Sequence, residues 1–311
     1  MVEKMGIMAG NIVLLLVLPL VMAGVIRRVK AFWGGRKGPC LRQPFFDLVR
    51  LLRKGEVIGS SSTWVSRAAP TVSLAAIVAA ACLVPLAGGR AIISFDGDFV
   101  VFAYLLALSR FSLVLAGLDA GSSFEGMGCS REVIFAALVE PGFFMIMAAL
   151  AGWAGTPSFA AIMAMLPHSV GGLWIINVLA AIGLLIMMLA EGSRVPVDDP
   201  ATHLELTMIH EVMVLDYSGP DLAYILYGTM VKMFLIGALA ANVLFPTVTL
   251  PWGWAAAVFL AAIPAEGVLV GMIESLMARL RLSHVPQFLF VMPALGLTLV
   301  FIVIMAWEKM I

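Results

Sequence analysis

The sequence predicts an all-α, polytopic integral membrane protein. Hydrophobic residues make up 62% of its 311 positions and charged residues only 12%. Several apolar runs reach the roughly 20 residues that an α-helix needs to cross the hydrocarbon core of a bilayer. The connections between these runs are short, which indicates a single transmembrane domain over residues 1–311. The net charge is zero, so nothing points to a nucleic-acid partner.

The apolar runs define eight spans. The first run is longer than the apolar core of a signal peptide, and no small-residue cleavage pattern follows it, so we interpret it as a helix. No internal repeat is evident, which argues against transporters built from inverted repeats. The predicted spans lie at about 7–27, 70–87, 99–118, 132–153, 171–190, 222–246, 253–275 and 286–307.

The basic residues predict the orientation of these spans, because Lys and Arg concentrate in cytoplasmic loops. Ten of the nineteen basic residues lie between Arg27 and Arg67. We therefore expect cytoplasmic loops at about 28–69 and 191–221, with the N-terminus outside. The loops on the other side hold Arg90 and little else.

Within the first of these loops, residues 44–54 (PFFDLVRLLRK) have the pattern of a short amphipathic helix. Phe45 and Leu48 fall on one face, and Asp47 and Arg50 fall on another. Such a helix would lie along the membrane surface. An ordinary solvated loop helix fits the segment equally well.

The densest group of ionisable residues follows the fifth span. Residues 190–225 hold four Asp, three Glu and two His, and ionisable residues are costly in so apolar a chain. Two prolines prevent a continuous helix at the start of this segment. Arg194 among carboxylates suggests an ion-pair network at this turn, and a simple helix-ending loop is the alternative. The neighbouring carboxylates are Glu191, Asp198 and Asp199.

Residues 201–215 have helical periodicity and predict a helix in which Glu211 interrupts an apolar face. The rest of that face would comprise Leu204, Met208 and Leu215. His203 and His210 lie on a separate polar stripe, where their spacing gives little support to a metal site. The segment also lacks the second His of an HExxH motif, so a zinc hydrolase is not supported.

Four further charged residues lie inside the predicted spans: Arg110, Glu140, Lys232 and Glu266. Charged groups at such depth face a partner or a wet cavity. A structural ion pair and a proton path both need such groups, so the residues alone leave both interpretations open. The sequence shows no catalytic triad, no glycine-rich phosphate loop and no cluster-binding cysteine set. Its three cysteines are scattered and fit the role of small packing residues.

Several of these segments resemble a known family. The chain is similar to the membrane subunit beneath the quinone chamber of respiratory complex I, and more closely to the membrane subunit of group 4 [NiFe] hydrogenases of the formate hydrogenlyase and hydrogenase-4 type. The first similarity rests on Arg36-Lys37-Gly38-Pro39, Gln43-Pro44, Asp47, Ala190-Glu191, Arg194, Pro196, Asp198, Pro200, Glu205 and Tyr217-Ser218. The second rests on the run from Asp199 to Asp221, Cys129-Ser130-Arg131-Glu132, Glu140-Pro141 and His284-Val285-Pro286-Gln287-Phe288.

The resemblance implies a non-catalytic subunit in the prokaryotic cytoplasmic (inner) membrane. It would anchor hydrophilic large and small hydrogenase-like subunits and an Fe–S subunit, and would contact antiporter-like membrane subunits. No cofactor is expected on this chain; Fe–S clusters and, in some relatives, a NiFe site belong to the partners. The residues implied at the redox-side interface are Arg36, Gln43, Asp47, Glu191, Arg194, Asp198, Asp199, Glu205 and Glu211. Those implied in a proton path are Glu140, Arg110, Lys232 and Glu266.

Two other functions stay open at this stage. The chain could be the quinone-binding membrane subunit of a complex I-type oxidoreductase, although Gly192, Asp199, His203 and His210 depart from the complex I pattern. It could also be a stand-alone ion transporter, against which the missing repeat and the very basic first loop both count. The sequence does not decide between protons and sodium as the translocated ion.

Overall fold

The computed structural model describes residues 2–57, 59, 62–166, 174–199, 208–245 and 247–308, with side chains from residue 10 onward. Within these ranges there are no strands, and eight helical spans are long and apolar enough to cross a membrane. This confirms the predicted fold class. The spans are α1 (Val2–Trp33), α3 (Trp64–Ala81), α4 (Asp98–Asp119), α5 (Ser123–Ala154), α7 (Trp174–Glu191), α8 (Gly219–Leu244), α9 (Trp252–Leu276) and the consecutive α10 (Val285–Leu289) and α11 (Val291–Glu308).

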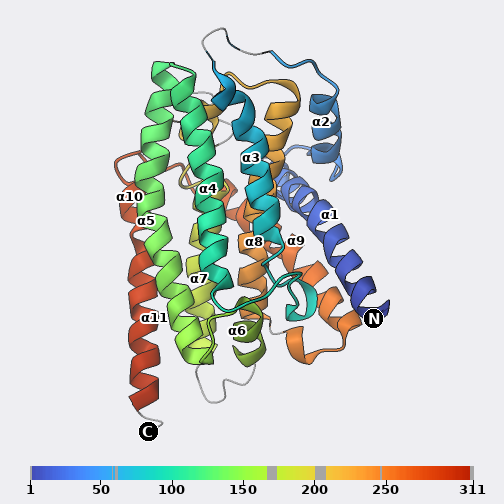
Figure 1. The fold of residues 1–311 in the computed structure, drawn as a ribbon, viewed down its shortest axis with the longest axis vertical. Coiled ribbons are helices and arrows are strands. Elements are labelled where there is room, and N and C mark those ends of the chain that lie inside the picture. Colours follow the sequence, from blue (N-terminus) through green and yellow to red (C-terminus); the bar gives the residue numbers. More distant parts are fainter. Residues whose placement is uncertain are drawn as a thin grey trace.

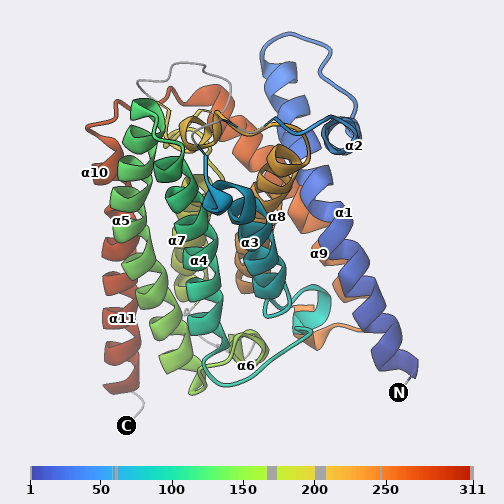
Figure 2. The same cartoon turned by 45° about the horizontal axis from the view of Figure 1, so that its top comes forward.

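The bundle has two unlike ends (Figures 1 and 2). One end carries the short helix α2 (Gln43–Leu52), the α4–α5 turn, the α7–α8 segment and the α9–α10 connection; we call it the charged end. Both chain termini and α6 (Phe159–Met165) lie at the opposite end. The described parts of the predicted loops 28–69 and 191–221 lie at this charged end.

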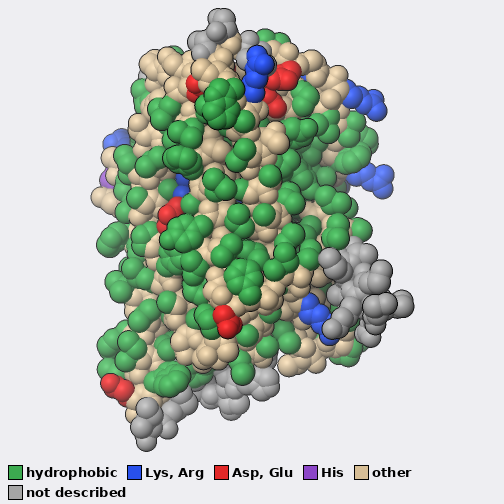
Figure 3. Space-filling view, in the orientation of Figure 1, with side chains coloured by type: hydrophobic (Ala, Val, Ile, Leu, Met, Phe, Trp, Pro, Cys, Tyr) green, Lys and Arg blue, Asp and Glu red, His purple; other side chains and the backbone are tan. Residues whose placement is uncertain are grey.

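Side chains are distributed as a bilayer requires. Hydrophobic side chains are spread over the long face in Figure 3, and the few charged side chains are scattered, with several near its upper edge. α8 is the central helix: it packs against α1, α3, α7 and α9, and 67% of the residues in its span are buried. The corresponding share for α10 and α11 is 28%, because this last span packs on the outside of α5 and α7.

Two spans begin earlier than the hydropathy of the sequence predicts. α3 starts at Trp64 rather than near residue 70, because the Thr63 hydroxyl caps it by accepting a hydrogen bond from the N–H of Val65 at 3.2 Å. α5 starts at Ser123 rather than near residue 132, although its first turns are polar and glycine-rich. Gly128 in those turns lies against Val212 and the carbonyl of Ile209, so tertiary packing extends the helix.

The predicted helix over 201–215 is wrong where the structure describes it. Residues 208–210 are not helical, and Glu211–Val214 form a single 3-10 turn. Met208 is buried while Leu215 is 49% exposed, so these two residues do not share an apolar face. The turn instead packs against α4 and α5, which determines its conformation. Residues 200–207, including His203 and Glu205, lie outside the described part of the chain.

Candidate functional site: a buried charge network

A guanidinium group forms the centre of the site. Arg110 lies nine residues before the last residue of α4, roughly 13 Å from the charged end along the helix axis. Its two terminal nitrogens donate hydrogen bonds to Glu140 of α5 and to Glu191 at the end of α7. Its Nε lies 3.5 Å from a carboxylate oxygen of Glu132. One buried cation therefore holds three carboxylates from two helices.

The network continues into α8 through Glu191. The second carboxylate oxygen of Glu191 lies 3.0 Å from the ammonium nitrogen of Lys232, and both side chains are only 4% exposed. Lys232 is thirteen residues from the start of α8, which is roughly 20 Å along the helix. Arg110, Glu132, Glu140, Glu191 and Lys232 together form what we call the charge network. It pairs two cations with three carboxylates in the interior of the bundle.

Glu140 is the exposed end of this network. Its side chain is 39% exposed, compared with 7% for its partner Arg110. An acidic side chain at this depth needs polar surroundings, since hydrocarbon does not solvate a carboxylate. The arrangement thus presents one carboxylate of the network on the outer surface of α5.

A small cavity connects the network to the α7–α8 segment. It has a volume of about 20 Å³ and is lined by Arg110, Glu132, Glu191, Asp198 and Ile209, among others. That volume accommodates roughly one water molecule, and the polar lining offers it several hydrogen-bond partners. A water here would lie between the charge network and Asp198.

Asp198 fixes the fold of the α7–α8 segment. Its carboxylate accepts hydrogen bonds from the N–H groups of Ile209 and His210, at 3.2 and 3.1 Å, and it pairs with Arg279 at 3.1 Å. The carbonyl of Pro196 in turn accepts a hydrogen bond from the N–H of Leu280. The segment is therefore attached to the α9–α10 connection at two points.

Arg194 has a different partner from the one its neighbours in sequence suggested. It pairs with Glu274 of α9 at 3.4 Å, and Glu274 also pairs with Lys30 of α1 at 2.8 Å. The expected pairing of Arg194 with Glu191 or Asp198 is wrong, because those two carboxylates are taken by Arg110 and Arg279. Glu274 is not among the residues singled out from the sequence. Its side chain is fully buried, and its acidic type at the end of an apolar helix was the available signal.

The first loop lies beside this second cluster. In α2, Asp47 pairs with Arg27 of α1 at 2.8 Å and with Arg50 at 3.0 Å, and it accepts a hydrogen bond from Gln43. Partial burial alone would raise the pKa of Asp47, but the hydrogen bond from Gln43 and the charge of Arg27 hold that pKa below its ordinary value. The implied grouping of Gln43 and Asp47 is thus present. Arg36 is exposed.

A larger cavity of about 270 Å³ separates α1, the α7–α8 segment and α8. Its lining combines charged side chains and a histidine with apolar side chains. The polar lining comprises Arg27, Lys30, Arg194, His210 and Glu211; the apolar lining comprises Val214, Ile225, Leu226, Met230 and Met233. Burial and the nearby charge of Lys232 lower the pKa of His210 to about 4, so this imidazole is neutral at neutral pH.

Glu266 lies apart from the charge network. One of its carboxylate oxygens is buried without a hydrogen-bond partner and approaches α8 at Gly237, where an added Cβ would lie only 2.6 Å from it. The carboxylate borders a cavity of about 200 Å³ whose other lining residues, from α7, α8 and α9, are all apolar. The structure therefore does not join Glu266 to Lys232 through a described hydrogen bond or ion pair.

The described residues contain no group of three or more His, Cys, Asp or Glu side chains arranged to hold a metal ion. The three cysteines lie apart, with Cys40 exposed and Cys129 buried. Within the described part of the chain, the site therefore consists of mostly buried titratable groups linked by ion pairs.

Comparison with known proteins fits this site. A family model described as NADH dehydrogenase matches residues 7–306. The chain belongs to this family. Its members include the formate hydrogenlyase subunit 4 of Escherichia coli (strain K12), to which the chain is 30% identical over 89% of its own length and 91% of the relative's. Hydrogenase-4 component C of the same organism is also 30% identical, over 82% of this chain and 78% of the relative.

Other members of the family are complex I proteins. One NADH-quinone oxidoreductase subunit, from Anaplasma phagocytophilum (strain HZ), is 29% identical over 68% of this chain and 67% of the relative. Among solved structures, a chain of the membrane-bound sulfane sulfur reductase, described as an archaeal respiratory membrane complex, superposes with a TM-score of 0.79 at 18% identity. The match covers 96% of this chain and 99% of the other and confirms the fold. The names of these relatives describe single components of multi-subunit membrane complexes.

Proposed function

We propose that this chain is the membrane-anchoring and energy-coupling subunit of a membrane-bound, hydrogenase-like redox complex. It links electron transfer in hydrophilic subunits to the translocation of protons or sodium. The observation that carries this proposal is the position of the charge network. It begins beside the α7–α8 segment at the charged end and ends at Glu140, an acidic side chain 39% exposed on the outside of a membrane span.

The two ends of the network call for two kinds of partner. At the charged end, exposed basic residues of the first loop, such as Arg36, Arg42 and Arg50, suit contact with hydrophilic large and small hydrogenase-like subunits and an Fe–S subunit. At Glu140, a neighbouring antiporter-like membrane subunit would supply the polar surroundings that lipid cannot. The proposal assigns the Fe–S clusters, and a NiFe site where one is present, to the partners and no cofactor to this chain.

The same proposal gives the orientation. The basic residues of the first loop belong on the cytoplasmic side, which places the charged end in the cytoplasm and the N-terminus outside. The host membrane would be the prokaryotic cytoplasmic (inner) membrane.

The variant Glu140→Gln tests the coupling role. Glutamine keeps the shape and the hydrogen-bonding capacity of glutamate but does not exchange a proton. In reconstituted vesicles we expect the assembled complex to transfer electrons between its soluble partners while the number of protons moved per electron falls. Glu308→Gln, an exposed carboxylate at the far end of α11, is the matched control. A wild-type ratio in Glu140→Gln would make Glu140 structural and refute its place in the path.

A quinone-binding subunit is the second candidate, favoured by the 270 Å³ cavity. Its cationic side chains suit a polar headgroup, and its Met and Leu side chains suit an apolar tail. Reduction assays with quinone as electron acceptor separate the two functions. Met233→Trp would fill part of the cavity, so loss of quinone reduction in that variant, with electron transfer to other acceptors unchanged, would favour this candidate.

A further inference from the structure

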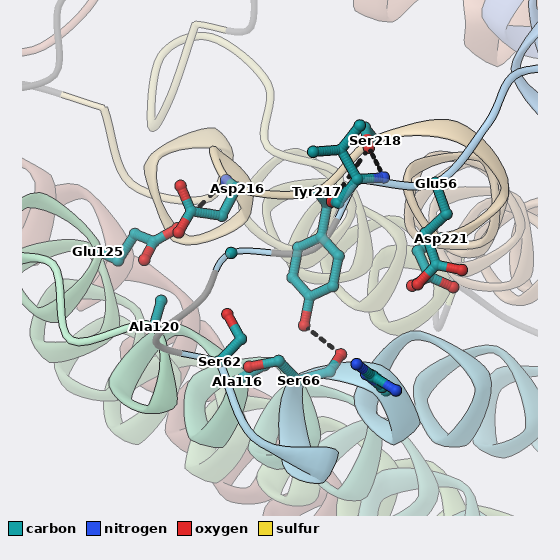
Figure 4. A pocket seen from close by; sticks show the side chains of 13 residues that line it. Glu56, Ser62, Ser66, Ala116, Ala120, Glu125, Asp216, Tyr217, Ser218 and Asp221 are labelled. Carbon is teal, nitrogen blue, oxygen red and sulfur yellow. Dashed lines mark hydrogen bonds between the residues drawn. The ribbon is translucent and has the colours of Figure 1, made fainter.

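A second group of carboxyl groups lies at the charged end, away from the charge network. It surrounds a pocket of about 20 Å³, which is space for roughly one water molecule. Its acidic lining is Glu56 from the first loop, Glu125 near the start of α5, Asp216 just before α8, and Asp221 in the first turn of α8 (Figure 4). We call it the carboxyl pocket.

Glu125 is the buried member of the carboxyl pocket. Its side chain is 1% exposed, and one of its two oxygens is buried without a hydrogen-bond partner. Its other oxygen accepts a hydrogen bond from the N–H of Asp216 at 3.3 Å. Figure 4 shows the Asp216 and Glu125 carboxyl groups directed toward one another. A buried oxygen without a hydrogen-bond partner is costly. Because this Glu125 oxygen lies beside a second carboxyl group, a proton shared by the two groups is the simplest way to satisfy it.

The other two carboxyl groups form a pair of their own. Glu56 and Asp221 both line the pocket, and their carboxyl groups lie side by side in Figure 4. Two neighbouring carboxylates repel each other when both are ionised, so a shared proton stabilises the pair. An ionised carboxylate only accepts hydrogen bonds, so a bond between the two groups would place that proton on one of them.

No described ion pair neutralises these four groups. Arg67 at the start of α3 also lines the pocket, but none of the described salt bridges joins it to them. The remaining neighbours add no positive charge. Asp119 of α4 is engaged by Thr63 and Ser66, Tyr217 donates to the carbonyl of Ser66 at 2.7 Å, and Cys129 of α5 donates to the carbonyl of Val114.

An apolar cluster separates this pocket from the charge network. The cluster comprises Leu113, Val114, Cys129, Met213, Val214 and Ile225. Along α4 it lies between Arg110 and the pocket residue Ala116, and along α5 it lies between Glu125 and Glu132. The carboxyl pocket is consequently a distinct site, and it exchanges with the solvent at the charged end through the exposed Glu56 and Asp216.

We propose that the carboxyl pocket is a proton-binding site that holds one proton between Glu56 and Asp221 and a second between Glu125 and Asp216. The ligand is the proton, because one oxygen of the buried Glu125 has no hydrogen-bond partner and the Asp216 carboxyl group is directed toward Glu125. This proposal does not depend on the proposed function, since the pocket lies outside the charge network.

Infrared difference spectroscopy on the purified, lipid-reconstituted complex tests it. Raising the pH from mildly acidic to alkaline should remove carbonyl absorption of protonated carboxyl groups in the wild type. The spectrum of Glu125→Gln should lack one component of that change, and the spectrum of Glu56→Gln should lack a different one. Each variant should also release about one proton fewer per chain than the wild type over the same pH change. Asp96→Asn, an exposed carboxylate at the opposite end, should leave the spectrum unchanged.

Two results would overturn the proposal. Spectra of both glutamine variants that match the wild type would show that the pocket holds no proton. Loss of the same carbonyl components on addition of NaCl at constant pH, but not of choline chloride, would identify the ligand as a sodium ion. If Glu125→Gln does not assemble, Asp216→Asn removes the exposed carboxyl group of the same pair. Its carbonyl spectrum and its proton release then replace those of Glu125→Gln.

Discussion

Arg110 and Arg194 show what a residue's position in the sequence does and does not reveal. The sequence indicated that Arg110 and Glu140 lie within spans and need partners, and the structure joins them directly. It did not indicate that Glu191 binds Arg110 and Lys232 rather than Arg194. Ion pairing between distant helices depends on their packing, which a hydropathy pattern does not contain.

Removal of the Arg110 guanidinium should strongly reduce the yield of assembled complex. Arg110→Ala leaves Glu132, Glu140 and Glu191 without their shared guanidinium, and breaking a buried pair in this way costs about 3–5 kcal/mol. We expect little assembled complex, measured as the yield of intact complex after detergent extraction and size-exclusion chromatography. Arg90→Ala removes an exposed arginine at the opposite end and should assemble normally. Equal yields of the two variants would contradict a structural role for the charge network.

His210 makes the docking of the α7–α8 segment sensitive to acid. The docked imidazole has a pKa of about 4, below the ordinary value of 6.5, so the undocked segment binds a proton more readily. The stabilisation that the neutral imidazole gives to the docked segment is fully present above pH 6.5, and it is lost as the pH falls from 6.5 toward 4. Limited proteolysis of the segment should therefore accelerate over this window. The acceleration should be smaller in His210→Gln and unchanged in His284→Gln, whose histidine is exposed.

At the scale of elements, α5 differs most from its prediction. Hydropathy located its apolar part correctly but not its polar first turns, which are held by Gly128 against the Glu211–Val214 turn. The same contact explains why residues 208–214 do not form an α-helix. The Glu211–Val214 turn packs against α4 and α5, and the N–H groups of Ile209 and His210 donate hydrogen bonds to the Asp198 carboxylate. At the start of α5 and at residues 208–214, tertiary contacts determine the backbone conformation more strongly than the local sequence pattern does.

Packing of α5 on α11 depends on one close backbone approach. A Cβ at Gly142 would lie 2.9 Å from the backbone nitrogen of Pro293. Gly142→Ala should therefore displace α11 and destabilise the protein by about 1–3 kcal/mol. Gly126→Ala, in the same helix with no atom near the added Cβ, should be neutral or slightly stabilising. Thermal unfolding in detergent compares the two variants, and an equal loss of stability would argue against close packing at Gly142.

At the scale of the whole molecule, the eight-span layout was predictable because the bilayer imposes it. Span length and charge bias between loops are set by the membrane rather than by contacts between helices. The shared placement of the first loop and the α7–α8 segment followed from that layout. The structure adds a direct contact between them, in which the Ser218 hydroxyl accepts a hydrogen bond from the N–H of Val57 at 2.9 Å.

The proposed orientation can be measured in intact cells. In a background where the native cysteines are replaced by serine, Asp96→Cys should react with a membrane-impermeant maleimide added outside, and Lys54→Cys should react only after the membrane is opened. Lys54 follows α2 at the charged end, and Asp96 precedes the start of α4 at the opposite end. The reverse labelling pattern would invert the orientation and remove the charged end from the cytoplasm.

Glu191 has two roles, as the last residue of α7 and as the carboxylate shared by Arg110 and Lys232. The backbone that leaves α7 at this residue runs directly into the segment fixed by Asp198 and Arg279. A pull on that segment therefore stretches two ion pairs at once, and the energy of each varies inversely with its length. If the chain couples electron transfer to ion movement as proposed, Glu191 would act as a transducer that converts a movement of this segment into a change of electrostatic potential inside the membrane.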